Sequence, residues 1–117
     1  MIGNHRDAWV FGSVDPTSGT AALVEISRAL SVLKHNHDWQ PRRSILFLSW
    51  GSEEYGLLGS TEWVEEFNKK LNLNAVAYLN LDISVQGNYS YTAKASPLLH
   101  NIIYDVTRKI KLTENSY

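Results

Sequence analysis

Residues 44–54 read Ser44-Ile45-Leu46-Phe47-Leu48-Ser49-Trp50-Gly51-Ser52-Glu53-Glu54. The first seven residues are almost continuously apolar, which is typical of a central strand that is covered on both faces. Two adjacent carboxylates follow at the point where this strand ends. Because residues just past the carboxyl ends of parallel strands converge on one crevice, this stretch predicts both an α/β sheet and the position of a ligand site.

Two further apolar segments end in the same way. Residues 1–4 precede His5, and residues 74–81 form a second predicted central strand, which precedes Asp82. One imidazole and several carboxylates at one edge of a sheet are the ligands of a divalent-metal site, and zinc suits this mixture. Because hardly any residues precede His5 to form its supporting strand, we interpret the chain as a fragment.

The segments between these strands have helical spacing. A first helix is predicted from Thr17 or Ser18, either of which can cap it, to about Lys34, and a second over residues 60–71. Residues 89–94 alternate weakly and predict an edge strand, and residues 113–117 are expected to fray. A third helix is predicted to start at Ser96-Pro97, with an apolar stripe of Leu98, Ile102, Ile103, Val106 and Ile110.

Strands and helices therefore alternate along the chain. This order implies right-handed crossovers and a mainly parallel sheet, which defines the fold class as α/β. We expect a three-layer sandwich built on a mainly parallel, mixed sheet. A nucleotide-binding α/β domain is a further candidate, but no strand is followed by a glycine-rich phosphate loop.

Composition limits the possible functions. The chain has 117 residues, of which 44% are hydrophobic and 20% charged, and this fits one soluble globular unit with a modest core. The formal net charge of −1 offers no basic surface for nucleic acid. No apolar run reaches the roughly 20 residues of a membrane span. The absence of cysteine excludes disulfides and thiolate ligands.

Each predicted ligand also has an ordinary structural explanation. A histidine near the start of a chain is usually exposed, so His5 alone is weak support for a metal site. Asp15 precedes Pro16 and fits a turn before a helix. Asp82 follows an apolar strand and fits a helix cap or a salt bridge. In the functional interpretation the side chains of His5, Asp15 and Asp82 meet, and the Asp15 carboxylate bridges two metal ions.

Glu53 and Glu54 are the more informative pair. Adjacent carboxylates repel each other, and burying either one without a cation is costly. A metal ion on one of them removes this conflict and leaves the other to act as general base on a metal-bound water. A solvated loop is the alternative. Asp7, two residues after His5, is predicted to accept the second ring N–H of that histidine.

Four segments carry a specific pattern: residues 3–12 (GNHRDAWVFG), 15–20, 41–45 and 49–63 (SWGSEEYGLLGSTEW). They resemble, in the same order, the peptidase domain of the glutamate carboxypeptidase II group, whose relatives include the transferrin receptors. The enzymes of this group are co-catalytic di-zinc exopeptidases. The resemblance runs over nearly the whole chain and implies that residues 1–117 are part of a zinc peptidase domain, its N-terminal metal-binding half, with a partial aminopeptidase-like fold.

The resemblance assigns five residues to a centre that holds two zinc ions. These are His5 and Asp82 on one ion, Asp15 bridging both, Glu54 on the other and Glu53 as general base. The second ion of the family also takes a histidine from much later in the chain than Tyr117. Loop geometry and the resemblance together predict a cis Asp15–Pro16 peptide bond.

Other implications of the resemblance concern the whole protein. Glu62 and Glu65 match two carboxylates that hold a structural calcium ion in the full-length enzymes, and a solvated acidic helix start is the alternative. Thr92 stands where the carboxypeptidase has an arginine that reads acidic substrates, so a broader peptidase is expected. The transferrin receptors have lost metal ligands that this chain keeps. A non-catalytic receptor-like ectodomain, used for binding and dimerisation, is therefore the weaker alternative to a peptidase.

Partners and location follow from the same resemblance. It implies a peptide substrate, a homodimeric parent protein and a cell-surface or extracellular ectodomain of a type II membrane protein. Contact with the membrane would run through a segment outside this chain. Asn88-Tyr89-Ser90 is an N-glycosylation sequon, which predicts a glycan on Asn88, and an unused sequon is the alternative.

Overall fold

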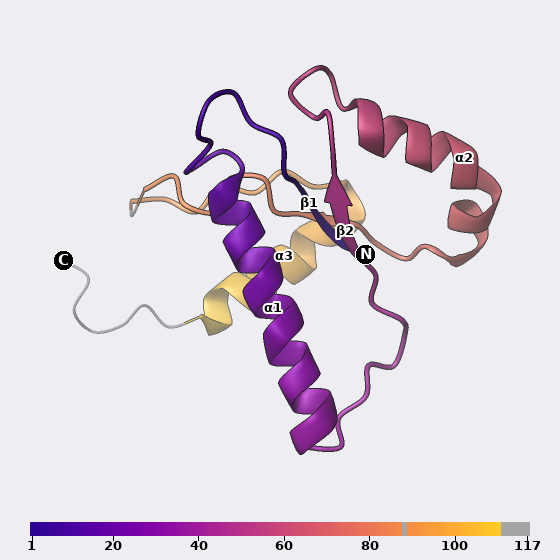
Figure 1. Ribbon diagram of the computed structural model, residues 1–117. Coiled ribbons are helices and arrows are strands. Elements are labelled where there is room, and N and C mark those ends of the chain that lie inside the picture. The colour runs from indigo at the N-terminus through magenta and orange to yellow at the C-terminus, as the bar shows by residue number, and fades with distance from the viewer. Residues whose placement is uncertain (88, 111–117) are drawn as a thin grey trace. The chain divides into compact units, whose positions relative to one another are not determined.

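A computed structural model describes residues 1–87 and 89–110 of the chain (Figure 1). The chain divides into two compact units, Met1–Gln86 and Gly87–Tyr117. The first unit contains a sheet and two helices, and it carries the predicted metal ligands. The predicted glycan site Asn88 and the predicted frayed end lie outside the described residues.

Three short parallel strands form the sheet of the first unit. They are β1 (Ile2–His5), β2 (Phe47–Trp50) and β3 (Leu79–Asn80), in the order β2-β1-β3. Ile2 lies opposite both Phe47 and Leu79, so β1 is the middle strand. The mainly parallel α/β sheet is confirmed.

The prediction that both long apolar segments form central strands is wrong for the described residues, because they flank β1. Phe47 and Leu79 are 37% and 52% exposed, whereas Asn4 in β1 is 1% exposed. An apolar run indicates how well the faces of a strand can be covered, but it carries no information about the order of strands in a sheet.

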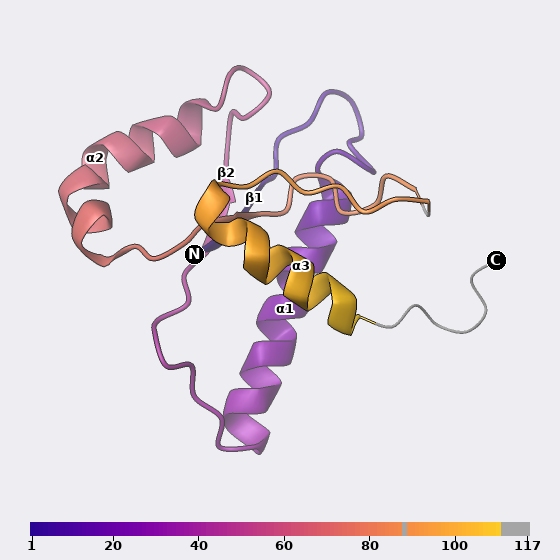
Figure 2. The ribbon, with the colours of Figure 1, turned by 180° about the vertical axis from the view of Figure 1, so that it is seen from behind.

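Helices α1 (Thr17–Asn36) and α2 (Leu58–Asn74) cover opposite faces of this sheet. Asn4 of β1 accepts a hydrogen bond from Thr20 of α1. Trp50 of β2, which pairs with the next residue of β1, packs against Trp63 of α2. Because successive side chains of a strand point to opposite faces, the two helices lie on the two sides of the sheet. Figures 1 and 2 show α1 and α2 on either side of β1 and β2 from both directions.

The start of α1 is held differently from the prediction. The helix begins at Thr17, but no side chain caps it. The Thr17 N–H donates to the Gly12 carbonyl, and the Ser18 hydroxyl donates to the Val14 carbonyl. The two hydroxyl residues lie inside the first turn, where their side chains cannot reach the free N–H groups that a capping residue satisfies.

The start of α2 fixes the loop that carries the paired glutamates. The helix begins at Leu58, two residues before the predicted start at Ser60, and ends at Asn74 rather than Leu71. Leu58 N–H donates to Ser52 O, and Gly59 N–H donates to Gly51 O. A Cβ atom on Gly59 would lie 2.4 Å from the Gly51 carbonyl oxygen, so only glycine permits this approach.

The second unit contains a 3₁₀ turn, η1 (Pro97–Leu99), followed by α3 (His100–Lys109). The predicted helix start at Ser96-Pro97 is confirmed, since Pro97 opens the turn. The predicted edge strand at residues 89–94 is wrong, because these residues are irregular. A strand needs a hydrogen-bonded neighbour, and none occurs among residues 87 and 89–110. In the described ranges, no helix has both the length and the apolarity to cross a membrane.

Candidate metal centre

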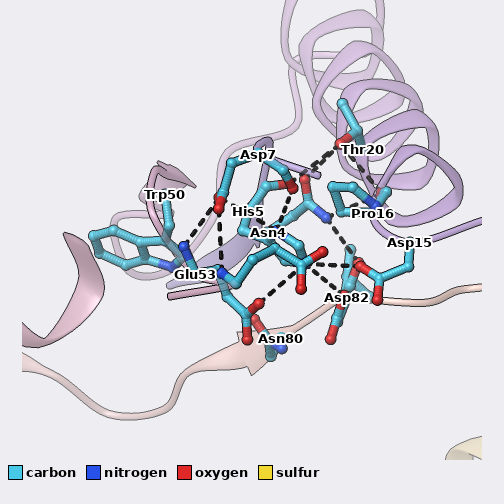
Figure 3. Close-up of polar contacts among 12 residues, drawn as sticks. Asn4, His5, Asp7, Asp15, Pro16, Thr20, Trp50, Glu53, Asn80 and Asp82 are labelled. Carbon is cyan, nitrogen blue, oxygen red and sulfur yellow. Dashed lines mark hydrogen bonds and ion pairs between the residues drawn. The ribbon is translucent and has the colours of Figure 1, made fainter. Parts of the chain in front are cut away.

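Three potential metal ligands meet beyond the carboxyl ends of the strands (Figure 3). His5 is the last residue of β1, Asp15 lies in the loop before α1, and Asp82 lies two residues after β3. His5 Nε2 is 2.8 Å from Asp82 Oδ1 and 3.1 Å from Asp15 Oδ1. One ligand atom from each residue lies within 4.8 Å of the others, so this part of the predicted site comes together.

The orientation of the His5 ring suits it for binding a cation. The Nδ1–H donates to the backbone carbonyl of Asp7 at 2.9 Å, which turns Nε2 toward the two carboxylates. Burial alone lowers the pKa of His5, but the hydrogen bond to Asp82 and the charges of Asp82 and Glu53 outweigh it, so this pKa is raised. A side chain that is 2% exposed is therefore held where positive charge is favoured.

Asp15 supplies the strongest indication that a cation fits here. Its Oδ1 atom is buried without a hydrogen-bond donor of its own, although it faces His5 Nε2. A carboxylate oxygen accepts but cannot donate, and leaving it buried and unpaired is costly. A divalent cation between Asp15, Asp82 and His5 would satisfy it. The Asp15–Pro16 peptide bond is cis, as predicted.

Glu53 lies beside these ligands. Its Oε2 atom is 3.7 Å from His5 Nε2. Burial raises the pKa of Glu53, and the charges of Asp82, Glu54 and Asp15 raise it further, while His5 opposes them. A carboxylate whose pKa is moved toward neutrality can both accept and return a proton, which is the property of a general base.

Asp7 acts through different atoms from those predicted. Its backbone carbonyl, rather than its carboxylate, accepts the His5 Nδ1–H; the carboxylate Oδ1 is 3.5 Å from Nδ1. The carboxylate accepts the backbone N–H groups of Glu53 at 3.0 Å and Glu54 at 3.2 Å. These two donors lower the pKa of Asp7 against the opposing effect of burial. Asp7 thus fixes the His5 ring and the glutamate loop at the same time.

Comparison with known proteins identifies the family. The model of peptidase family M28 matches residues 1–116. The chain belongs to peptidase family M28. It is 53% identical over 116 residues to the mouse aminopeptidase NAALADL1, covering 99% of this chain and 16% of the relative. It is 50% identical over 111 residues to a probable maize glutamate carboxypeptidase, VP8, covering 95% of this chain and 15% of the relative.

A third relative is more distant. The chain is 45% identical over 111 residues to a glutamate carboxypeptidase 2 homolog of Caenorhabditis elegans, covering 95% of this chain and 14% of that protein. The M28 chain therefore spans about one sixth of the length of the curated relatives it matches. The resemblance to the glutamate carboxypeptidase II group is confirmed.

Glu54 does not join the three converging ligands of this M28 chain. Among the described residues, the group whose ligand atoms lie within 4.8 Å of one another contains His5, Asp15 and Asp82. Glu54 follows β2 and Asp82 follows β3, the two strands that flank β1. The Glu54 charge is nevertheless among those that raise the pKa of Glu53. Its role as ligand of a second ion stays a prediction.

The other predicted site residues have no metal-like surroundings. Glu62 and Glu65 lie in α2 and are exposed, and neither belongs to a group of three ligands in the described parts of the chain. Thr92 is exposed in the irregular segment of the second unit. The structure thus gives no support to a calcium site at Glu62 and Glu65, which remains a prediction from resemblance.

Two buried residues beside the candidate ligands were not predicted from the sequence. Asn4 and Gly19 are both buried in the first unit, and neither is a metal ligand. The sequence did contain a signal for Asn4, because this polar amide lies within a short predicted strand, directly before the candidate ligand His5. No local pattern distinguishes Gly19, because its role depends on a segment more than sixty residues further along the chain.

Proposed function

We propose that this chain is the metal-binding part of a zinc-dependent exopeptidase and that His5, Asp15 and Asp82 hold one zinc ion. The observation that carries the proposal is the buried, unpaired Oδ1 atom of Asp15 facing His5 Nε2. Membership of peptidase family M28 supports the reaction class, hydrolysis of a peptide bond. Imidazole nitrogen and carboxylate oxygen are both protein ligands of zinc, and three protein ligands are usual at a catalytic zinc.

Within this proposal, the residues of the chain have separate roles. His5 binds through Nε2 because its Nδ1–H is occupied by the Asp7 carbonyl. Asp15 and Asp82 both supply negative charge beside Nε2 of the imidazole. When bound, zinc would supply Lewis-acid polarisation of the peptide carbonyl and would lower the pKa of a nearby water.

Glu53 is the proposed general base. It accepts a proton from water as the water oxygen bonds to the carbonyl carbon of the peptide. It then returns that proton to the amine nitrogen as the carbon–nitrogen bond breaks. The raised pKa of Glu53 supports this role, because the group must take up and release a proton in turn. The Asp7 carboxylate orients Glu53 by accepting a hydrogen bond from the Glu53 backbone N–H.

The metal site is tested by zinc affinity, measured by competition with a chromogenic chelator in the native-length protein that contains this chain. His5→Ala is expected to weaken zinc binding at the site at least about tenfold, because it removes a ligand. His35→Ala is the matched control, since His35 is exposed in α1. Equal affinities of the His5→Ala variant and the wild type would refute the proposed metal centre.

The general base is tested separately. Glu53→Gln is expected to abolish peptidase activity in the native-length protein while zinc affinity stays close to that of the wild type. Glu66→Gln, in the exposed part of α2, is the control. A Glu53→Gln variant with full activity would refute the role of Glu53 and leave the metal site standing.

The 117-residue chain by itself is expected to have negligible peptidase activity, even with added zinc. A second ion would have only Glu54 and the bridging Asp15, fewer than the three protein ligands usual at a catalytic zinc. The isolated chain should therefore bind at most one zinc tightly. Chelator-sensitive hydrolysis by the purified chain, abolished by Glu53→Gln, would contradict this expectation.

By resemblance, we further propose that two zinc ions occur in the native site, with Glu54 on the second. By the same resemblance, we propose a peptide substrate, a homodimer, calcium at Glu62 and Glu65, and a cell-surface ectodomain attached through a segment outside this chain. A glycan on Asn88 belongs to this proposal and is the simplest part to check. Peptide mapping after eukaryotic expression should find Asn88 modified, and an unmodified Asn88 would argue against a secretory route.

A further inference from the structure

Asn4 is a buried polar side chain that the proposed reaction does not use. It lies in β1 directly before His5 and is 1% exposed. Its Nδ2 group donates to the carbonyl of Leu81 at 3.1 Å and to the carbonyl of Pro16 at 3.4 Å. Its Oδ1 atom accepts the hydroxyl of Thr20 at 2.6 Å. All three polar contacts run to segments that lie beside the metal centre (Figure 3).

The two carbonyls that Asn4 bridges belong to the neighbours of two proposed ligands. Pro16 directly follows Asp15, and Leu81 directly precedes Asp82. One amide group therefore ties the loop before α1 to the segment after β3. The orientation of the amide is fixed by chemistry, because backbone carbonyls only accept and must face the NH₂ group rather than the oxygen.

The same two segments are in direct backbone contact elsewhere. A Cβ atom on Gly19 would lie 1.5 Å from the carbonyl oxygen of Leu81 and 2.2 Å from that of Asp82. The N–H of Ser84 donates to the hydroxyl of Ser18 at 3.0 Å. The first turn of α1 therefore packs closely against residues 81–84, which include Asp82.

We propose that Asn4 is a positioning residue that sets the separation of Asp15 and Asp82 for a divalent cation. This inference rests on the proposed metal centre. The two carboxylates meet at one imidazole and repel each other, and a hydrogen-bonded bridge between their backbones opposes this repulsion. The buried Asn4 amide forms this bridge by donating to the carbonyls of Pro16 and Leu81, and the Thr20 hydroxyl holds the amide in the required orientation.

Asn4→Leu tests the proposal, because leucine has a similar size but makes none of the three hydrogen bonds. In the native-length protein, zinc affinity measured by chelator competition should fall about 10- to 100-fold, the range typical of a residue that supports metal ligands. The visible absorption spectrum of the cobalt(II)-substituted protein should also change, since it reports the ligand geometry. Neither readout requires enzyme activity.

A second pair of variants keeps the test valid if Asn4→Leu does not fold. Thr20→Val removes the hydroxyl that the Asn4 oxygen accepts, whereas Thr20→Ser keeps it. Thr20→Val should lower zinc affinity and alter the cobalt spectrum, and Thr20→Ser should restore both toward the wild type. A purely structural role predicts instead that affinity follows stability in every variant.

Tyr78→Phe is the control for loss of stability alone. The Tyr78 hydroxyl accepts a hydrogen bond from Trp50 and donates to Asn80, at 2.8 Å each, and it makes no hydrogen bond to Asn4 or to the three ligands. This variant loses polar contacts but should keep the wild-type zinc affinity and cobalt spectrum.

The proposal for Asn4 is overturned if folded Asn4→Leu and Thr20→Val proteins bind zinc as the wild type does, with an unchanged cobalt spectrum. It is also overturned if Tyr78→Phe weakens zinc binding as much as they do. If His5→Ala leaves zinc affinity unchanged, the proposed metal centre itself is wrong and both proposals fall together.

Discussion

The two faces of the sheet are held by different kinds of interaction. Under α1, hydrogen bonds join Asn4 to the two ligand loops, and Gly19 allows backbone to touch backbone. Under α2, aromatic rings pack against one another. Their centroids are 5.4 Å apart for Trp50 and Trp63, 5.2 Å for Trp63 and Phe67, and 6.4 Å for Trp50 and Tyr78.

The two faces therefore affect the geometry of the metal site and the stability of the fold to different extents. Hydrogen bonds are directional, so the α1 face sets where Asp15 and Asp82 lie relative to His5. Aromatic packing buries a large area, so the aromatic cluster under α2 contributes mainly stability. Changes to the hydrogen bonds under α1 should therefore affect metal binding and stability together, whereas changes within the aromatic cluster under α2 should affect mainly stability.

The largest loss of stability is expected for Gly19→Ala. In an ordinary helix interior this substitution stabilises by roughly 0.5–1 kcal/mol. Here the new Cβ would lie 1.5 Å from the Leu81 carbonyl oxygen, and backbone atoms cannot move aside as a flexible side chain can. Overpacking of this kind should destabilise by about 3 kcal/mol, the upper end of the usual range. Urea denaturation and zinc competition should both show the loss.

Ser27→Ala is the control for Gly19→Ala, because it places alanine in the same helix at a half-buried side chain whose hydroxyl bonds within the helix, to the Val24 carbonyl. Its stability should stay within about 0.5 kcal/mol of the wild type. If Gly19→Ala proved as stable as this control and bound zinc normally, the α1 face would not set the geometry of the site.

A smaller loss of stability, without a loss of metal binding, is expected for Trp63→Ala. Trp63 is half-buried and touches both Trp50 and Phe67. Full truncation of a buried aromatic costs about 3–5 kcal/mol, so a half-buried ring should cost about 2 kcal/mol. Zinc affinity should remain within about twofold of the wild type. A tenfold weaker affinity would show that the two faces are not separable.

Asp7→Asn should have an intermediate effect on stability and a selective effect on catalysis. The asparagine keeps one acceptor oxygen, so one of the two N–H groups at Glu53 and Glu54 loses its partner. Loss of a hydrogen bond to a charged group costs about 1.5 kcal/mol. In the native-length protein, kcat should fall more than zinc affinity, because the loop of the general base is loosened. Asp105→Asn, in exposed α3, is the control. Equal losses in both measurements would contradict this role.

The sequence was sufficient to predict the α/β class, the candidate ligands His5 and Asp82 at the ends of strands, and the two main helices. Each of these depends on a local signal, namely an apolar run, helical spacing or a ligand residue at the end of a strand. The resemblance to known peptidases supplied the roles of Asp15 and Glu53, which the local signals left open.

The remaining features depend on contacts between distant segments. The position of β1 in the middle of the sheet follows from pairing with both Phe47 and Leu79, which no local pattern encodes. The Asp7 carboxylate was predicted to hold His5, but it binds the backbone of the loop at Glu53 instead. The edge strand at residues 89–94 was predicted from weak alternation, and such a pattern forms a strand only where a partner strand is present.

The smallest expected effect concerns Tyr78 at alkaline pH and tests the α2 face alone. Burial raises the pKa of Tyr78 above its ordinary value, and the hydrogen bond from Trp50 opposes this. The folded state therefore favours the neutral phenol. Its contribution to stability is complete below the unfolded pKa of about 10 and is lost as the pH rises through the folded pKa.

Tyr78→Phe should accordingly be less stable than the wild type at pH 8, by about 1 kcal/mol for the lost hydrogen bond. Between pH 9 and 11 the urea midpoint of Tyr78→Phe should fall less steeply than that of the wild type. The two proteins differ at this one tyrosine and share the other five, so the difference in slope reports the Tyr78 phenol. Zinc affinity at pH 8 should not change. Parallel pH profiles for the two proteins would mean that the Tyr78 phenol is not held neutral by its place under α2.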